Sequence, residues 1–272
     1  MRRSAVVRAR IEQRSGLIIP GCHDPLSARL IEAAGFEAAY LSGLAANAVV
    51  GLPDLGNMSL TSMEARTREI ASAISLPLFV DADNGFGGVA DAAESARRLE
   101  AAGAVGVNLD DTVLPRAAGA PKTLEPIHLV QDKVAAARGA CADADFLVIG
   151  RTDAMSTHGP DEALRRARAL EDAGADALMV PYLTEARQVR MFAAALRVPL
   201  FIAVTETARE SFSAEELAGA GHAATVYPVT VLLAGLGAQA RALAHLAQAG
   251  DTQAIEAKMM PIGELRALTK PI

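Results

Sequence analysis

Two aspartates one residue apart follow a short apolar run in this chain of 272 residues. The run covers residues 77–80, and Asp81 and Asp83 come before glycines at positions 85, 87 and 88. Side chains alternate along a strand, so we expect these two carboxylates to point the same way, about 7 Å apart. Twist and bending of the strand would bring them closer. At a separation of roughly 5 Å, the two carboxylates would repel each other by about 3 kcal/mol at an effective dielectric near 20. A divalent cation would turn this repulsion into attraction, and Mg²⁺ is the usual choice beside substrate oxygens.

The same pair has a second interpretation from the residues alone. Aspartate is a good helix cap, and a helix is expected to begin near Val89. A short Asp-x-Asp-x-Gly motif matches by chance too often to decide between a cap and a metal site. The decision therefore depends on the rest of the chain.

Composition and charge narrow the class of protein. The net charge of −6 argues against a nucleic-acid partner, because phosphate binding needs a basic surface. We find no signal peptide and no apolar stretch that is long enough and free enough of charge to cross a membrane. Cys22 and Cys141 lie far apart without metal-ligand spacing, so neither a disulfide nor a zinc site is expected. We expect a reduced, cytoplasmic protein.

Short apolar runs alternate with helical patterns, which indicates parallel β–α–β units. Strands are expected at residues 17–21, 38–42, 76–81, 105–110, 146–151, 177–181, 200–204 and 223–227. Helices are expected at 26–34, 62–73, 89–102, 126–138, 160–173, 184–195, 213–218 and 231–249. Eight such units predict one (β/α)8 TIM barrel over residues 1–272, with 251–272 as a C-terminal extension. An open doubly wound sheet is the alternative.

Polar residues stand where the expected strands end. A barrel brings these ends together at one mouth, and charged groups after apolar strands are unfavourable unless paired or bound to a metal. The residues concerned are Ser42, Asp81, Asp83, Asp110, Asp111, Arg151, Asp153, Thr205 and Glu206. Their expected convergence favours the metal site over the helix cap.

Five stretches resemble a known family. They read Tyr-Leu-Ser-Gly at 40–43, Gly-Leu-Pro-Asp at 51–54, Val-Asp-Ala-Asp-Asn-Gly-Phe-Gly at 80–87, Leu-Asp-Asp at 109–111 and Gly-Arg-Thr-Asp-Ala at 150–154. In this order and spacing they resemble the isocitrate lyase and phosphoenolpyruvate mutase superfamily, over roughly residues 4–250. The resemblance implies a barrel, dependence on Mg²⁺ (or Mn²⁺), and a small 2-oxo or 2-hydroxy carboxylic acid as substrate.

The resemblance also implies roles for single residues. Asp81 resembles the principal metal ligand, Asp83 and Asp54 resemble carboxylates that hold its waters, and Asp110 stands where the family usually has a glutamate. The loop residues Ser42, Gly43 and Leu44 resemble those that bind the substrate carboxylate. Arg151 resembles an arginine that holds the substrate's oxygen and carboxylate, a bidentate task suited to a guanidinium. We therefore expect Arg151, Asp54 and Tyr40 in catalysis and Asp81, Asp83 and Asp110 at the metal. From the residues alone, a structural ion pair is the alternative for Arg151.

The loop after strand four departs from the family. Its lyases carry a Lys-x-Cys-Gly-His element there, whose cysteine acts in proton transfer, whereas residues 114–122 read Leu-Pro-Arg-Ala-Ala-Gly-Ala-Pro-Lys. The glutamate that lyases place after strand six is replaced near Tyr182, and the asparagine on strand seven by Ala203. Arg116 and Lys122 are either parts of a lid over a substrate carboxylate or solvated loop charges.

Decarboxylation of oxaloacetate to pyruvate needs no loop acid, and it is the expected reaction. The enolate that forms when CO₂ leaves would be stabilised by the cation and Arg151, and solvent can protonate it. Residues 111–115 also resemble the family's oxaloacetate decarboxylases. The alternatives are a carbon–carbon lyase of the 2-methylisocitrate or dimethylmalate type, phosphonopyruvate chemistry, and a non-catalytic carboxylate-binding barrel. Cys22 could replace the missing acid, although a lone cysteine at a strand end is more often a core residue.

A homotetramer is a further implication of the resemblance, with the last helix exchanged between neighbouring barrels. The apolar helix expected at 231–249 and the segment 258–272 are long enough to reach a partner. The sequence does not decide the oligomeric state.

Overall fold

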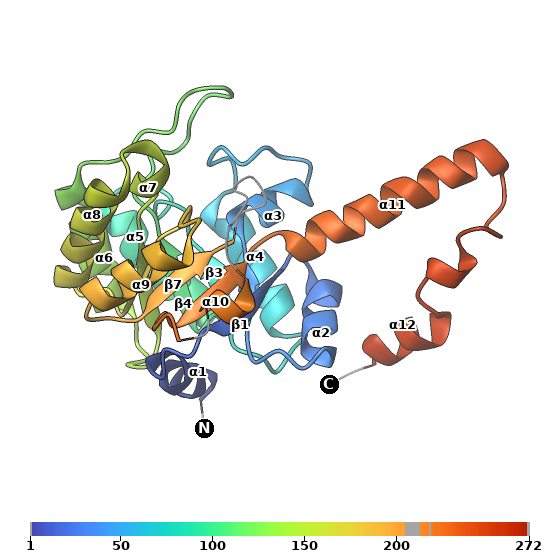
Figure 1. The fold of residues 1–272 in the computed structure, drawn as a ribbon, viewed down its shortest axis with the longest axis horizontal. Helices are drawn as coiled ribbons and strands as arrows, with labels where there is room; N and C mark the ends of the chain where they lie inside the picture. Colours follow the sequence, from blue (N-terminus) through green and yellow to red (C-terminus); the bar gives the residue numbers. More distant parts are fainter. Residues whose placement is uncertain (1, 205–212, 218, 271–272) are drawn as a thin grey trace.

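The computed structural model describes residues 2–204, 213–217 and 219–270. Within them, eight parallel strands form a closed barrel in sequence order, and β1 pairs with both β2 and β8 (Figure 1). The strands are β1 (Leu17–Cys22), β2 (Ala39–Leu41), β3 (Leu78–Asp81), β4 (Gly106–Leu109), β5 (Leu147–Arg151), β6 (Ala177–Met179), β7 (Leu200–Ala203) and β8 (Ala224–Tyr227). The predicted (β/α)8 barrel is confirmed, and each expected strand is found with its ends shifted by at most two residues.

Helices surround the barrel and connect its strands. They are α1 (Arg3–Glu12), α2 (Pro25–Ala33), α3 (Gly43–Ala48), α4 (Leu60–Ala71), α5 (Val89–Ala101), α6 (Ile127–Ala140), α7 (Ala154–Thr157), α8 (Pro160–Asp172), α9 (Ala186–Ala195), α10 (Ala214–Leu217), α11 (Thr230–Ala249) and α12 (Ile262–Leu268), with a 3₁₀ turn η1 (Glu256–Lys258). The short helices α3 and α7 were not predicted, because a single turn carries too little periodicity. Both directly follow strands that end at the site described below.

Alternation along the strands separates two layers of core. Phe79 and Phe201 lie in the barrel interior, with ring centroids 5.6 Å apart in an edge-to-face contact. Val80, one residue further, belongs to the outer core between strands and helices. Val7 and Ile11 of α1 pack into the interior cluster and cover the end of the barrel where the strands begin. The carboxyl ends of the strands are thus left for the polar side chains.

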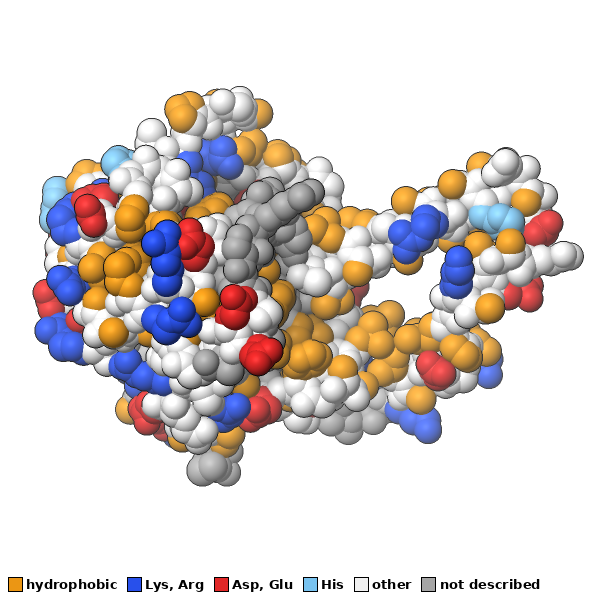
Figure 2. Space-filling model, viewed as in Figure 1, with side chains coloured by type: hydrophobic (Ala, Val, Ile, Leu, Met, Phe, Trp, Pro, Cys, Tyr) orange, Lys and Arg blue, Asp and Glu red, His pale blue; other side chains and the backbone are white. Residues whose placement is uncertain are grey.

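The C-terminal part of the chain projects from the barrel. Figure 1 shows α11 extending away from it and α12 returning towards α2. Arg29 of α2 donates hydrogen bonds to the backbone oxygens of Leu268 (2.6 Å) and Lys270 (2.7 Å). We call the segment from α11 to α12 the C-terminal arm. Hydrophobic side chains lie on its surface (Figure 2), namely Leu233, Leu236, Leu243, Leu246, Met259, Met260 and Ile262. Exchange of the arm between subunits stays a prediction. None of the described helices has the length and apolarity needed to cross a bilayer.

Candidate active site

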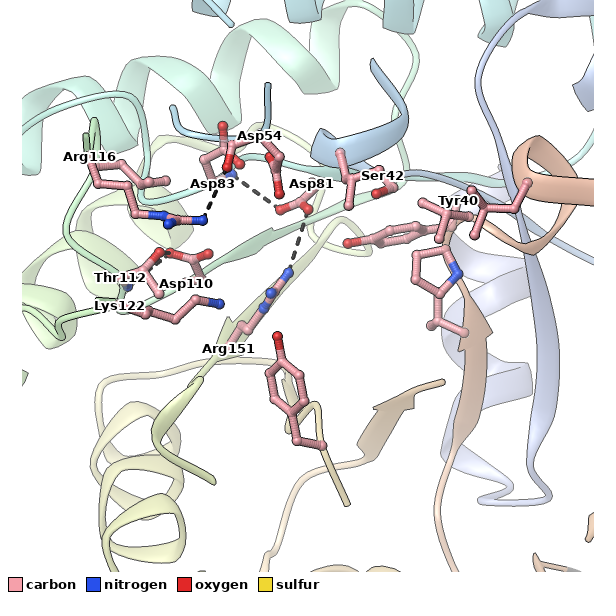
Figure 3. Close-up of a pocket in the computed structure, with 17 residues that line it drawn as sticks. Tyr40, Ser42, Asp54, Asp81, Asp83, Asp110, Thr112, Arg116, Lys122 and Arg151 are labelled. Atoms are coloured by element: carbon pink, nitrogen blue, oxygen red, sulfur yellow. Dashed lines mark hydrogen bonds and ion pairs between the residues drawn. The ribbon is translucent and has the colours of Figure 1, made fainter. Parts of the chain in front are cut away.

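A cavity of about 260 Å³ opens at the carboxyl ends of the strands (Figure 3). Every residue predicted for catalysis, for substrate binding or for the metal lines it, except Gly43, whereas Asp111 and Asp153, also predicted at the mouth, do not. The lining consists of Tyr40, Ser42, Leu44, Asp54, Asp81, Asp83, Asp110, Thr112, Leu114, Arg116, Lys122, Arg151, Tyr182, Val226, Pro228, Val229 and Leu233. Gly43 instead supports the site from outside the lining, because its N–H donates to Asp81 Oδ2 at 3.2 Å.

Asp81, the last residue of β3, is held by donors on several sides. Its Oδ1 accepts from Asn108 Nδ2 at 2.7 Å and from the N–H of Asp83 at 3.3 Å. Its Oδ2 lies 3.5 Å from Arg151 Nη1, a contact drawn in Figure 3. The side chain is buried, so these contacts fix the carboxylate in one orientation.

Asn108 is a site residue that the sequence analysis missed. It lies beside Asp81 in the register of β3 and β4, and its Oδ1 accepts a hydrogen bond from the Tyr40 hydroxyl at 2.7 Å. Tyr40 is therefore connected to Asp81 through this amide. The signal in the sequence was a polar residue inside an apolar strand, two positions before Asp110 and hence on the same face.

The predicted relation between Asp81 and Asp83 was wrong in its geometry. The strand stops at Asp81, and Asp83 has a left-handed backbone with φ of 46°. The chain turns here because Gly85 donates its N–H to the carbonyl of Ala82 at 2.8 Å, so strand alternation no longer applies. This turn still brings both carboxylates to the cavity.

The helix-cap interpretation of these aspartates is also wrong. Helix α5 begins at Val89, and its N-cap residue Gly88 donates its N–H to Asp91 Oδ2 at 2.8 Å. The carboxylate at this helix end is therefore that of Asp91, which leaves Asp81 and Asp83 to the cavity.

Burial raises the pKa of several cavity carboxyls. The pKa of Asp110 rises to about 7 mainly through burial, although Arg151 opposes the shift. Burial and then repulsion from Asp81 raise the pKa of Asp83 well above its usual value. Asp54 keeps solvent contact at the rim, but the same two causes, desolvation first, raise its pKa as well. Carboxyls in this state gain from a bound cation, because it favours their charged form.

Arg151 forms an ion pair with a neighbouring aspartate. Such a structural pair was the alternative to a role in substrate binding. Its Nε lies 2.9 Å from Asp153 Oδ1 and its Nη2 donates to Asp153 Oδ2 at 3.3 Å, while Nη1 faces Asp81. Lys122 also pairs with Asp153. Burial would raise the pKa of Asp153, but these two cations outweigh it and lower the pKa to about 2. The ion pair therefore orients Arg151 within the cavity wall.

The loop at 114–122 packs against the segment that carries Asp54. The backbone N–H of Arg116 donates to the carbonyl of Leu55 at 3.0 Å, and its Nη2 donates to the carbonyl of Asp54 at 3.3 Å. Lys122 lies with its Nζ 5.7 Å from the centre of the Tyr182 ring. Both loop cations line the cavity rather than extending into solvent.

A buried lysine supports the turn after β3, and this too was missed. Lys133 of α6 donates from Nζ to the carbonyl of Asn84 at 2.9 Å and to both oxygens of Glu125, at 2.9 and 2.7 Å. Asn84 Nδ2 in turn donates to Glu125 Oε1 at 3.2 Å. The network fixes the residue next to Asp83.

Cys22 does not replace the missing loop acid. It is fully buried, it is not part of the cavity lining, and burial raises the pKa of its thiol to about 12. Ala203 lies on β7, as expected, and is the last residue of that strand. Thr205 and Glu206, predicted at the same mouth, lie outside the residues that the structure describes.

The carboxylate set fits a cation that keeps most of its water. Asp81, Asp83 and Asp110 are buried oxygen donors at one cavity. Across the described parts of the chain, no three His, Cys, Asp or Glu side chains converge closely enough to enclose an ion directly. Mg²⁺ suits such a place, because it retains several waters and binds through one or two carboxylates together with substrate oxygens.

Comparison with known proteins places the chain among enzymes. Residues 7–247 match the model of a family described as phosphoenolpyruvate phosphomutase. A relative from Corynebacterium glutamicum, named probable 2-methylisocitrate lyase 2, is 38% identical over 235 residues, which are 85% of this chain and 76% of the relative.

Two solved structures are similar over nearly the whole chain. The crystal structure of phosphoenolpyruvate phosphomutase from Streptomyces platensis subsp. rosaceus has a TM-score of 0.89 at 33% identity, covering 97% of this chain and 94% of that one. A phosphonopyruvate hydrolase in complex with oxalate and Mg²⁺ has a TM-score of 0.89 at 29% identity, covering 98% and 95%.

Proposed function

The chain belongs to the phosphoenolpyruvate phosphomutase family, within the isocitrate lyase and phosphoenolpyruvate mutase superfamily, and we propose that it is a Mg²⁺-dependent carbon–carbon lyase. Its substrate would be a small 2-hydroxy carboxylic acid of the 2-methylisocitrate type. That it is an enzyme of the lyase class follows from the family and from the relatives. That the bond broken is a carbon–carbon bond is our proposal.

The two unlike walls of the cavity carry this proposal. One wall presents the carboxylates and Arg151, which suit a chelated cation and the oxygens of a hydroxy acid. The other is apolar and consists of Val226, Pro228, Val229 and Leu233, from β8 and the residues that follow it, whereas Leu114 lies beside Asn84 near the carboxylates. Burying an alkyl group there is favourable by about 0.8 kcal/mol per CH₂. A 2-alkyl-2-hydroxy acid uses both walls, whereas oxaloacetate has no alkyl branch to bury.

The reaction begins at the 2-hydroxyl. Mg²⁺, when bound, would polarise the 2-oxygen and the adjacent carboxylate. Asp54 is placed to accept the hydroxyl proton, because desolvation and the charge of Asp81 raise its pKa and make it a better base at neutral pH. As the C2–C3 bond breaks, C2 becomes the carbonyl carbon of a ketone, and the electron pair of the broken bond moves to C3. Arg151 stabilises the negative charge on the oxygens.

Oxaloacetate decarboxylation, which the sequence analysis put first, is the second candidate. One observation favours it: residues 114–122, all described by the structure, contain no cysteine or histidine to protonate a carbanion. The 2-methylisocitrate lyase relative and the apolar wall favour carbon–carbon cleavage over it.

A substrate panel tests the proposal. Purified protein with Mg²⁺ should release a 2-oxo acid from 2-methylisocitrate or 2,3-dimethylmalate, and should lose this activity with a chelator and in Asp81→Asn. Asp251→Asn, which changes an exposed carboxylate on the arm, is the matched control and should keep full activity. Turnover of oxaloacetate alone would establish the second candidate in its place.

A further inference from the structure

Carbon–carbon cleavage leaves a carbanion at C3 that needs a proton, and this inference rests on the proposed function. Among the described residues that line the cavity there is no cysteine and no histidine. Among these lining residues, the side chains acidic enough to supply the proton in place of solvent are a phenol, an ammonium or a protonated carboxyl.

Most of these groups are committed elsewhere. The Tyr40 hydroxyl donates to Asn108 at 2.7 Å and lies at the Asp81 side of the cavity, where the 2-oxygen would bind. Lys122 is held by Asp153 in an ion pair that favours its protonated form. Asp83 and Asp110 belong to the carboxylate wall. None of them is free to serve C3.

Tyr182 differs from all of these. It follows β6, it is partly exposed to the cavity, and its hydroxyl has no hydrogen-bond partner among the described residues. Its backbone is left-handed, with φ of 66°, a conformation that is disfavoured for a bulky residue and that clusters at functional sites. This unusual backbone conformation places the Tyr182 side chain in the cavity lining.

Lys122 gives this phenol an electrostatic partner. Its Nζ lies 5.7 Å from the ring centre, and Asp153 holds it there. A cation beside the ring would stabilise the negative charge left on the phenolate after proton transfer. The lysine comes from the loop after β4 and the tyrosine from the end of β6, so the pair exists only in the folded barrel.

We propose that Tyr182 is the general acid that protonates C3 of the departing fragment. The electron pair of the C2–C3 bond takes the proton of the Tyr182 hydroxyl and forms a new C–H bond. The resulting tyrosinate regains a proton from solvent, and the proton first taken from the 2-hydroxyl returns to solvent from its base. The products are a 2-oxo acid and a carboxylate that carries one new hydrogen.

The test compares Tyr182→Phe with the wild-type enzyme in D₂O. Phenylalanine keeps the ring beside Lys122 and removes only the acid. We expect kcat to fall by about 10²- to 10⁴-fold with little change in KM. Wild type should give one enantiomer of the monodeuterated carboxylate, whereas the variant, protonated by solvent, should give both. Lys122→Met should lower kcat and still give one enantiomer.

Binding of oxalate with Mg²⁺, measured by calorimetry, should be equal in wild type and Tyr182→Phe and shows that the variant is folded. A variant with near-wild-type kcat, or one that still gives a single enantiomer, would overturn the role of Tyr182 and leave the lyase proposal standing. A wild-type enzyme that cleaves no hydroxy acid of the panel would overturn both proposals.

Discussion

Asn108 Nδ2 donates to Asp81 Oδ1 at 2.7 Å across the adjacent strands β4 and β3. The amide also accepts from Tyr40, so its orientation is set from the opposite side. Partners of this kind hold a metal-binding carboxylate in the geometry that the cation requires. We therefore expect the orientation of the Asp81 carboxylate to depend on this neutral residue.

Replacing Asn108 tests this dependence. Asn108→Leu keeps the size of the side chain but leaves Asp81 and Tyr40 without their partner, and we expect a loss of about 10- to 100-fold in Mg²⁺ affinity or activity. Tyr40→Phe leaves the Asn108–Asp81 hydrogen bond in place and should cost less Mg²⁺ affinity. Mg²⁺ titration by calorimetry measures both variants. An unchanged Mg²⁺ affinity in Asn108→Leu would show that Asn108 does not position Asp81.

Removing one partner of the buried Lys133–Glu125 pair should strongly destabilise the protein. Lys133 is 1% exposed, and Lys133→Met would leave the Glu125 carboxylate buried without its cation. We expect a loss of about 3–5 kcal/mol in the free energy of unfolding, because breaking a buried pair leaves an uncompensated charge. Urea denaturation measures it.

A double variant is the control for this pair. Lys133→Met combined with Glu125→Met should recover much of the loss, because no unpaired charge remains. Strictly additive losses would contradict a direct interaction. Lys258→Met, an exposed lysine of η1, should have little effect.

The fold could be predicted because the sequence patterns that specify its strands and helices are local. Apolar runs and helical periods mark the strands and helices even where the ends are misplaced. The expected strand 177–181 ends at Met179, and Pro181 could not have continued it as a hydrogen-bond donor. The carboxylates at strand ends were equally visible, and the structure brings Asp54, Asp81, Asp83 and Asp110 to one cavity.

What the sequence could not supply were contacts between distant segments. Lys133 lies 49 positions from Asn84, and nothing in the local pattern of α6 distinguishes it from a surface lysine. The direction of Asp83 depends on a positive φ at a non-glycine residue, which strand alternation does not foresee. Asn108 was visible only as a polar residue in an apolar strand.

His222 should make the protein less stable in mild acid. It is 2% exposed, and burial lowers its pKa below the ordinary value of 6.5. As the pH falls through about 6.5, the unfolded chain binds a proton that the folded chain does not. The free energy of unfolding therefore falls below pH 6.5, by at most about 1.4 kcal/mol per pH unit for this one group.

Urea denaturation at pH 7.5 and 5.5 checks the His222 prediction. His222→Gln cannot take up the proton, so its stability should change less between the two pH values than that of wild type. An identical change in both proteins would show that His222 does not carry this dependence. The comparison between proteins removes the contribution of carboxyls common to both.

Surface leucines of α11 should drive assembly. Leu243 is 66% exposed, and exposed apolar side chains in a row indicate an interface. We predict a homotetramer, with a mass by light scattering of four times the 28.2 kDa chain, and a shift to smaller species in Leu243→Glu. Gln239→Glu adds the same charge at an exposed polar position of the helix and should not change the mass. A wild-type mass of one chain would contradict the prediction.

The activity proposed for this cavity is cleavage of a carbon–carbon bond in a branched hydroxy acid. The most direct measurement is an NMR time course of equimolar 2-methylisocitrate and oxaloacetate with enzyme and Mg²⁺. Breaking the C2–C3 bond of 2-methylisocitrate gives pyruvate and succinate, and only this substrate yields succinate. We predict that succinate appears in step with the loss of 2-methylisocitrate, while oxaloacetate decays at its enzyme-free rate. Accelerated loss of oxaloacetate without any succinate would contradict the account.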